Sequence, residues 1–188
     1  MKIHFGFTRL YKIIRRNYLY IRYKFITKIY NPTNGLNYLA KNDASTLIRA
    51  LRKGGAKIGD NVDIQIPILF HQVKDFKKLT IGNNSHIGKT TFLDLSDAII
   101  IGNRVTISMG SMLITHIDVG ASGLSMKYPK KKDKVIIGDD SYLGCQTTIL
   151  AGVKLGSNNL VAAKSLVLHS TPDSVLIAGI PARIIKNV

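Results

Sequence analysis

The side chains of this 188-residue chain that suit proton transfer or nucleophilic chemistry are few. The chain has five histidines, one cysteine (Cys145) and 11 acidic residues, all of them aspartates. Histidine exchanges a proton near neutral pH, which makes it a frequent general acid or base. His116 is distinctive because it directly precedes a long segment that contains the lysine-rich stretch 127–134. The sequence therefore favours His116 as the candidate for proton-transfer chemistry.

Cysteine chemistry and bound metals are not expected. A single Cys145 can form neither an internal disulfide nor a cysteine-built zinc site, and no second motif residue supports it as a nucleophile. We expect no metal ion. The remaining histidines have no comparable placement and are expected at the surface or in satisfied positions: His4, His71, His86 and His169.

A six-residue repeat predicts the elements that would position His116. An aliphatic residue followed by glycine recurs in one frame, and small or β-branched residues follow four positions after most of the aliphatics. Each six-residue unit forms one side of a coil, and three sides close one coil of about 18 residues. Stacked coils pair their strands in parallel around an aliphatic column. The composition agrees, because no Glu beside 11 Asp, 12 Asn, 16 Gly and 26 Ile favours short strands and tight turns. The dipeptides in frame are Ile58-Gly59, Ile81-Gly82, Ile87-Gly88, Ile101-Gly102, Ile137-Gly138, Leu143-Gly144 and Leu155-Gly156.

The frame predicts where coils begin and end. A coil over 119–136 would turn Lys131 into the core, which costs several kcal/mol for an unpaired charge, so 119–134 is predicted to be an excursion loop. Ile99 and Ile100 add a two-residue slip, and residues 70–80 interrupt the first coil. The predicted coils are a partial one at 58–69 and full ones at 81–98, 101–118, 137–154 and 155–172.

The N-terminal segment is expected to be helical. Asp43 is a good N-cap for a helix over 44–53, and residues 7–29 have the spacing of an amphipathic helix with a basic opposite side, ended by Asn31-Pro32. No apolar run reaches about 18 residues, and the N-terminus lacks the pattern of a secretory signal. The apolar stripe of this helix is Phe7, Leu10, Ile14, Tyr18, Ile21, Phe25 and Ile29. The predicted organisation is an N-terminal basic, helical segment (1–57), the coils (58–172) and a C-terminal tail packing on the coils (173–188).

At residues 50–188 the sequence resembles the hexapeptide-repeat acyltransferases, and within them the branch of maltose, galactoside and polysaccharide O-acetyltransferases. Three stretches carry the resemblance: ISMGSMLITHID at 107–118, IGDDSYLGCQTTILAGV at 137–153, and 161–186, which ends in AGIPARIIK. The resemblance implies a mainly β fold, a left-handed parallel β-helix, and an acetyl-CoA-dependent O-acetyltransferase acting on a sugar or glycan hydroxyl. It also implies a homotrimer with acetyl-CoA in a groove between subunits.

The resemblance assigns roles to particular residues. His116 matches the general base, which takes the acceptor's proton for direct transfer in a ternary complex, and Asp94 or Asp118 is a candidate to orient its imidazole. The acceptor is expected to contact Thr90, Asp94 and Asp118. The matches to positions beside CoA are Tyr142, Gly144, Ala162, Ala163, Lys164 and Arg183. The lysine-rich stretch is either a solvated loop or a source of attraction for phosphates.

Other functions remain open. A serine acceptor in place of a sugar, and a non-catalytic scaffold or glycan-binding protein, both fit the repeat. A metal-dependent lyase of the γ-carbonic anhydrase type needs a second histidine five residues after the first, where this chain has Ala121. For residues 1–30, packing within the protein, peripheral contact with an anionic membrane and nucleic-acid binding compete, and nucleic acid is not expected. The expected location is the cytoplasm, with the inner face of the membrane as a variant.

Overall fold

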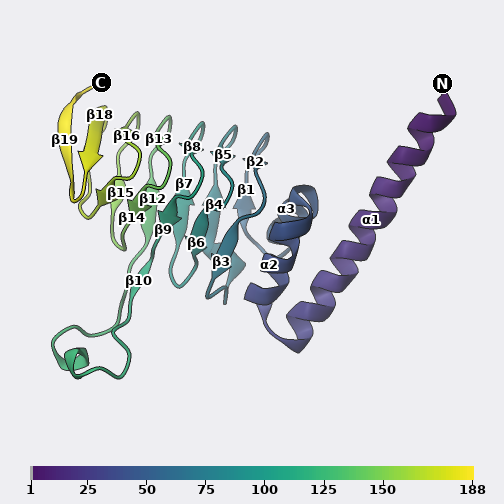
Figure 1. Cartoon of the computed structure of the whole chain (residues 1–188), viewed down its shortest axis with the longest axis horizontal. Helices are drawn as coiled ribbons and strands as arrows, with labels where there is room; N and C mark the ends of the chain where they lie inside the picture. Colours follow the sequence, from purple (N-terminus) through teal and green to yellow (C-terminus); the bar gives the residue numbers. More distant parts are fainter. Residues whose placement is uncertain (1) are drawn as a thin grey trace.

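The computed structural model is a β-solenoid with three helices at its N-terminal end and one long loop that leaves an edge of the coils (Figure 1). It describes the backbone of residues 2–188 and the side chains of residues 8–188. The sequence-based assignments of His4 and Phe7 therefore lie outside the described side chains. The predicted parallel β-helix is confirmed, since the strands pair coil to coil in three parallel sheets.

The helices are α1 (Lys2–Ile29), α2 (Pro32–Asn42) and α3 (Ala44–Lys53). Helix α3 begins as predicted, with the Asp43 side chain accepting a hydrogen bond from Thr46 N at 2.7 Å. Helix α2 was not predicted, because Asn31-Pro32 was interpreted only as the end of the preceding helix. The same dipeptide also starts α2, since the Asn31 side chain accepts from Asn34 N and proline suits the first turn.

Helix α1 packs through a different face from the one that its pattern indicates. The predicted apolar stripe from Leu10 to Ile29 is exposed, whereas Leu19 and Tyr23, on the face expected to be basic, are buried. That face packs against α2 and α3. In residues 2–188, no helix combines the length and the hydropathy needed to cross a bilayer.

Three parallel sheets form the sides of the solenoid, and each coil contributes one strand to each sheet. The first sheet contains β1 (Lys57–Ile58), β4 (Leu79–Ile81), β7 (Ile99–Ile101), β12 (Val135–Ile137) and β15 (Lys154–Leu155). The second contains β2 (Asp63–Ile64), β5 (His86–Ile87), β8 (Thr106–Ile107), β13 (Tyr142–Leu143), β16 (Leu160–Val161) and β18 (Val175–Gly179), and β19 (Ala182–Asn187) pairs antiparallel with β18 at its end. The third contains β3 (Leu69–His71), β6 (Phe92–Asp94), β9 (Met112–Leu113), β14 (Thr148–Ile149) and β17 (Leu166–Val167).

The first coil is complete, so its prediction as a partial coil ending at 69 is wrong. Strand β3 continues to His71 and pairs with β6 over its whole length. The predicted interruption shrinks to a turn with a short 3-10 helix, η1 (Phe76–Lys78). The two residues of the predicted slip, Ile99 and Ile100, belong to strand β7. Ile99 is buried and pairs with Leu79 of the coil below and Val135 of the coil above.

Short polar residues and glycines recur at the corners of the coils, where the chain turns from one sheet to the next. Asn83, Asn103 and Asp139 each accept, through the side chain, a backbone N–H from the coil below, at 2.8 to 2.9 Å. Aspartate and asparagine are short enough to make this bond at the spacing of adjacent strands, about 4.8 Å. A Cβ on Gly82 would lie 2.5 Å from the backbone of Gly102, so the glycines are needed for close stacking.

The excursion loop leaves the third coil as a two-stranded antiparallel stem. Strands β10 (His116–Ile117) and β11 (Lys131–Lys132) pair with each other, and the loop between them holds the short 3-10 helix η2 (Gly123–Met126). Figure 1 shows this loop projecting away from the solenoid. The stem begins at His116, so the fold places this histidine where the solenoid ends and the loop starts.

Candidate active site

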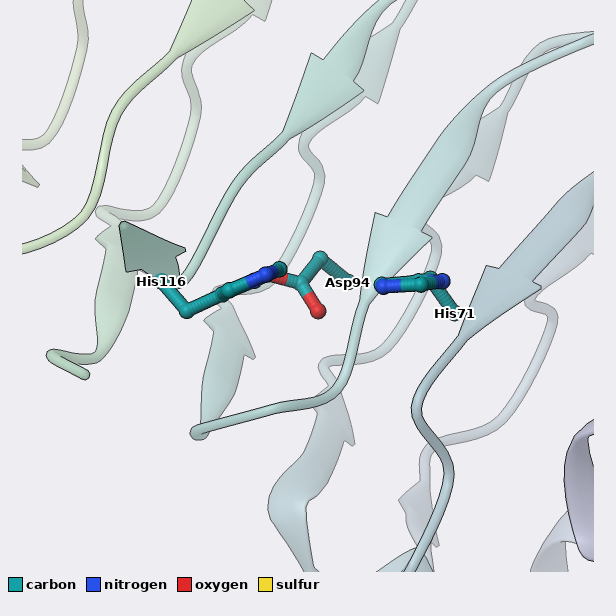
Figure 2. Close-up of side chains that lie close together, drawn as sticks. All are labelled: His71, Asp94 and His116. Carbon is teal, nitrogen blue, oxygen red and sulfur yellow. The ribbon is translucent and has the colours of Figure 1, made fainter. Parts of the chain in front are cut away.

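His116 is held by a buried aspartate of the neighbouring coil. Asp94 ends β6, and its Oδ2 lies 2.5 Å from His116 Nδ1. The Asp94 side chain is fully buried, whereas that of His116 is 19% exposed. Figure 2 shows the carboxylate lying against the imidazole ring. The aspartate thus fixes one ring nitrogen and leaves Nε2 available to exchange a proton.

A network of hydrogen bonds holds the Asp94 carboxylate. Oδ1 accepts from Ser96 N at 3.1 Å and Ser96 Oγ at 2.8 Å, and Oδ2 accepts from Thr115 N at 2.9 Å and Thr115 Oγ1 at 3.0 Å. Burial raises the pKa of Asp94, but the hydrogen bonds from His116, Thr115 and Ser96 outweigh it, so that its pKa lies below the ordinary value. Asp94 is therefore an anion at neutral pH.

The two candidate aspartates make different contacts. Asp94 has no exposed surface in this subunit and lies against His116 Nδ1, which favours its predicted orienting role over a contact with the acceptor. Asp118 forms an ion pair with Lys130 and accepts from Gly120 N, which lowers its pKa. These contacts stabilise the base of the loop.

A second histidine lies at the site and was missed from sequence. His71 ends β3, directly below Asp94 in the register of the third sheet. Its ring stacks on that of His116 with ring centroids 5.6 Å apart, and Figure 2 shows both histidines next to Asp94. The His71 ring also stacks on Phe92, with centroids 5.8 Å apart. His71 was expected at the surface or in a satisfied position, because it lacks a placement comparable to that of His116. The signal that would have found it is the continuation of Leu69-Phe70 into a strand whose third residue, His71, is partly buried.

The cluster of His71, Asp94 and His116 also has the residue types of a metal site, since one ligand atom from each lies within 4.8 Å of the others. Asp94 Oδ2 already accepts from Thr115 N, Thr115 Oγ1 and His116 Nδ1. Binding a cation there would require that network to rearrange, so a hydrogen-bonded pair behind His116 fits the geometry better.

The predicted CoA contacts lie on other parts of the solenoid. Tyr142, on β13, is exposed, and its hydroxyl accepts from Ser108 Oγ at 3.1 Å. Gly144 lies under Ala163, since a Cβ on Gly144 would be 2.5 Å from Ala163 N. Both residues approach the corner between the second and third sheets.

The other candidate contacts lie at that corner and at the C-terminal end. Lys164 turns the corner next to Ala162 with a positive φ of 59°. Arg183, on β19, lines a cavity of about 500 Å³ that also involves Val167 and Thr171. Thr90 turns the corner before β6, at the opposite end of that strand from Asp94. One subunit thus brings neither Thr90 nor the corner residues to His116.

Comparison with known proteins identifies the repeat. The family described as "Hexapeptide repeat of succinyl-transferase" matches residues 78–114 and 134–164. Galactoside O-acetyltransferase of Escherichia coli K12 is 24% identical over 139 residues, which cover 71% of this chain and 64% of that protein. Serine acetyltransferase 2 of Arabidopsis thaliana is 32% identical over 104 residues, 54% of this chain and 30% of that protein. The chain thus spans less than two thirds of either relative.

Solved structures share the fold. A maltose O-acetyltransferase from Clostridium difficile 630 matches with a TM-score of 0.71 and 21% identity, over 81% of this chain and 82% of that one. A galactoside acetyltransferase in complex with coenzyme A matches with a TM-score of 0.71 and 20% identity, over 92% and 82%. The repeat, the relatives and the solenoid together show that this chain is a hexapeptide-repeat protein with the left-handed β-helix fold of known acyltransferases, and that its sequence is similar to that of galactoside O-acetyltransferase.

Proposed function

We propose that this protein transfers an acetyl group from acetyl-CoA to a hydroxyl of a sugar or glycan, with His116 as the general base. The observation that carries the proposal is the partly exposed His116 held by a buried, ionised Asp94 at 2.5 Å. An alcohol is a poor nucleophile at neutral pH, and a positioned imidazole is suited to removing its proton. The similarity to galactoside O-acetyltransferase supports both the acyl donor and the acceptor class.

The reaction proceeds by direct transfer. His116 Nε2 takes the hydroxyl proton as the acceptor oxygen attacks the thioester carbonyl, and the imidazolium that forms is stabilised by the Asp94 carboxylate on Nδ1. The tetrahedral intermediate then expels the thiolate of CoA, which receives the proton from Nε2. No covalent bond to the protein forms, and the products are the acetyl ester and free CoA.

The placement of the residues supports a homotrimer. His116 lies where the third sheet ends, whereas Ala162 and Lys164 lie at the corner where that sheet begins. A strand and a loop therefore separate the base from the proposed CoA contacts within one subunit. Packing the third sheet of one subunit near the corner of its neighbour brings the two sets together, and a closed ring of three such contacts makes three equal sites.

The loop beside His116 supplies positive charge to this interface. Lys127, Lys130, Lys131, Lys132 and Lys134 are exposed. Acetyl-CoA and many activated sugars carry phosphates, and clustered lysines raise the local concentration of such anions. Arg183 and Tyr142 are proposed to contact CoA in the same groove.

A serine acceptor is the second candidate, because serine acetyltransferase 2 is 32% identical over about half of this chain. Its acceptor also offers a primary hydroxyl, so the same base serves both reactions. An acceptor panel separates the two: thiol release from acetyl-CoA is measured with sugars, nucleotide sugars and serine.

The central test is His116→Ala on the acceptor that turns over. Turnover is expected to fall by about 10²- to 10⁴-fold, the contribution of general-base catalysis. His86→Ala is the matched control, because His86 Nδ1 lies 2.9 Å from Asp63 Oδ2 in a similar but exposed pair. Near-normal turnover of a folded His116→Ala protein would contradict the proposed role of His116 as general base. Absence of acetyl-CoA binding by calorimetry would favour a scaffold, and loss of turnover on chelation would favour a metal at the histidine pair.

A further inference from the structure

Helix α1 carries an apolar surface that the rest of the chain leaves uncovered. We define the outer stripe as Leu10, Ile14, Tyr18, Ile21, Phe25 and Ile29, whose exposed fractions run from 54% to 67%. Single exposed apolar residues are normal, but a continuous row of six large ones is typical of an interaction surface. With a rise of 1.5 Å per residue, the row is about 28 Å long.

The packing of α1 shows that the outer stripe is not needed to hold the helix in place. Leu19 and Tyr23, which are 5% and 8% exposed, attach α1 to α2 and α3. At 100° per residue they lie on the side of the helix opposite Phe25 and Ile14. Figure 1 shows α1 extending along its length away from the coils. The stripe therefore faces outward from the whole N-terminal end.

The spacing of the outer stripe suits a flat partner. Its residues are separated by 4, 4, 3, 4 and 4 positions. At 100° per residue the six side chains fall within a sector about 100° wide on one side of the helix. A helix with one apolar side of this width can lie with that side against a plane.

Positive charge borders the outer stripe on both sides. Lys24 and Lys28 lie along one border and Arg22 along the other, as placed by the helical angle, whereas Arg15 is paired with Asp43. The whole of α1 contains eight Lys/Arg and no acid. Long basic side chains beside an apolar row can lay their stems on the hydrocarbon boundary and keep their charges among phosphates.

A second copy of this chain is a poor match for that charge. The chain has 27 basic and 11 acidic residues, and its aspartates are largely engaged. Ion pairs or histidine contacts occupy Asp43, Asp63, Asp94, Asp118, Asp133 and Asp140. Nucleic acid would match the charge but would leave Ile21 and Phe25 in water. A surface with anionic groups outside and an apolar layer just beneath them would match both the basic residues and the apolar stripe of α1.

We propose that α1 is a docking element that lies in the plane of an anionic lipid bilayer, with the outer stripe inserted between the headgroups. Lys24, Lys28 and Arg22 then reach the lipid phosphates from the two borders. Leu19 and Tyr23 keep α1 attached to α2 and α3, so docking holds the solenoid close to the membrane surface. The inference is independent of acetyl transfer.

The test is co-sedimentation of the full chain with vesicles of phosphatidylcholine containing about one third phosphatidylglycerol. The double variant Ile21→Gln/Phe25→Gln removes two exposed side chains and keeps good helix formers. Its partition coefficient is expected to fall by about tenfold or more, since each buried methylene adds to interfacial binding. Lys24→Gln/Lys28→Gln is expected to weaken binding to anionic vesicles and to reduce its salt dependence.

The matched control is Leu124→Gln/Met126→Gln on the excursion loop, the other projecting element. It makes two comparable changes at residues that are 54% and 94% exposed, and it is expected to bind vesicles as the unmodified chain does. Equal partitioning of the unmodified chain and the stripe variant overturns the proposal. So does a stripe variant that keeps vesicle binding and instead loses self-association by light scattering or binding to a duplex DNA fragment.

Discussion

Replacing Asp94 with asparagine changes one atom in the buried network behind His116 and tests its role directly. Both carboxylate oxygens accept a backbone N–H, Oδ1 from Ser96 and Oδ2 from Thr115. The asparagine NH₂ must point at one of these two donors, whichever way the amide turns. One backbone N–H is then left unpaired in a buried position, which costs about 1–3 kcal/mol of folding free energy.

The same change removes the negative charge next to the imidazolium that forms during transfer. A hydrogen bond to a charged group contributes about 1.5–3 kcal/mol, and each 1.36 kcal/mol is a factor of ten in rate. We therefore expect kcat to fall by about 10- to 150-fold at neutral pH. KM for acetyl-CoA is expected to stay nearly constant, because Asp94 is fully buried behind His116.

The assay combines two measurements on each variant. Thiol release from acetyl-CoA gives kcat, and urea unfolding gives the free energy of unfolding. Asp63→Asn is the matched control, because it alters the exposed pair with His86 at 2.9 Å and is expected to change neither quantity appreciably. A folded Asp94→Asn protein with kcat within about threefold of the unmodified chain would refute the positioning role, since that difference is below 1 kcal/mol.

Three further predictions concern other contacts. His71→Ala removes the ring stacked on His116, so kcat is expected to fall about tenfold through a loosened base, and His71→Phe is expected to restore it by keeping the stack. Gly82→Ala places a Cβ 2.5 Å from the Gly102 backbone, and urea unfolding is expected to show a loss of about 1–3 kcal/mol. Burial raises the pKa of Asp43, but hydrogen bonds from Thr46 and the charges of Arg16 and Arg15 outweigh it, so that its pKa lies below the ordinary value. A lowered folded-state pKa stabilises the fold above the unfolded value of about 3.9, so Asp43→Ala is expected to cost about 1 kcal/mol at pH 7, and the charge-dependent part of that cost is expected to be lost as pH falls from about 4 through the lowered folded-state pKa.

The coils could be predicted because the short sequence of each side is enough to show which side chains point inward. Each side repeats the same short pattern, so Ile107, Leu143 and Ile149 could be assigned to the interior without knowing which coil lies above or below, and all are buried. The absence of glutamate has the same origin, since the corner ladder through Asn103 and Asp139 uses side chains of aspartate length. The lysine at 131 likewise excluded a further coil on the energy of burial alone.

The site was predictable only in part. The resemblance identified His116, but the sequence left both Asp94 and Asp118 as candidates to orient its ring, and it did not place His71 at the site. Partner choice depends on which strand ends lie one above another. The insertion near His71 and the two-residue slip at Ile99 shift that stacking by amounts that a six-residue frame does not determine.

The sequence by itself determined the solenoid, the loop and the position of the proposed base, because a periodic pattern specifies which side chains turn inward. Only the tertiary structure decided that Asp94 holds His116, that His71 stacks on it and that the apolar stripe of α1 faces outward. The physical reason is that these contacts join segments about 20 to 45 residues apart. Their geometry is set by how complete coils and helices pack, and not by the preferences of the residues nearby.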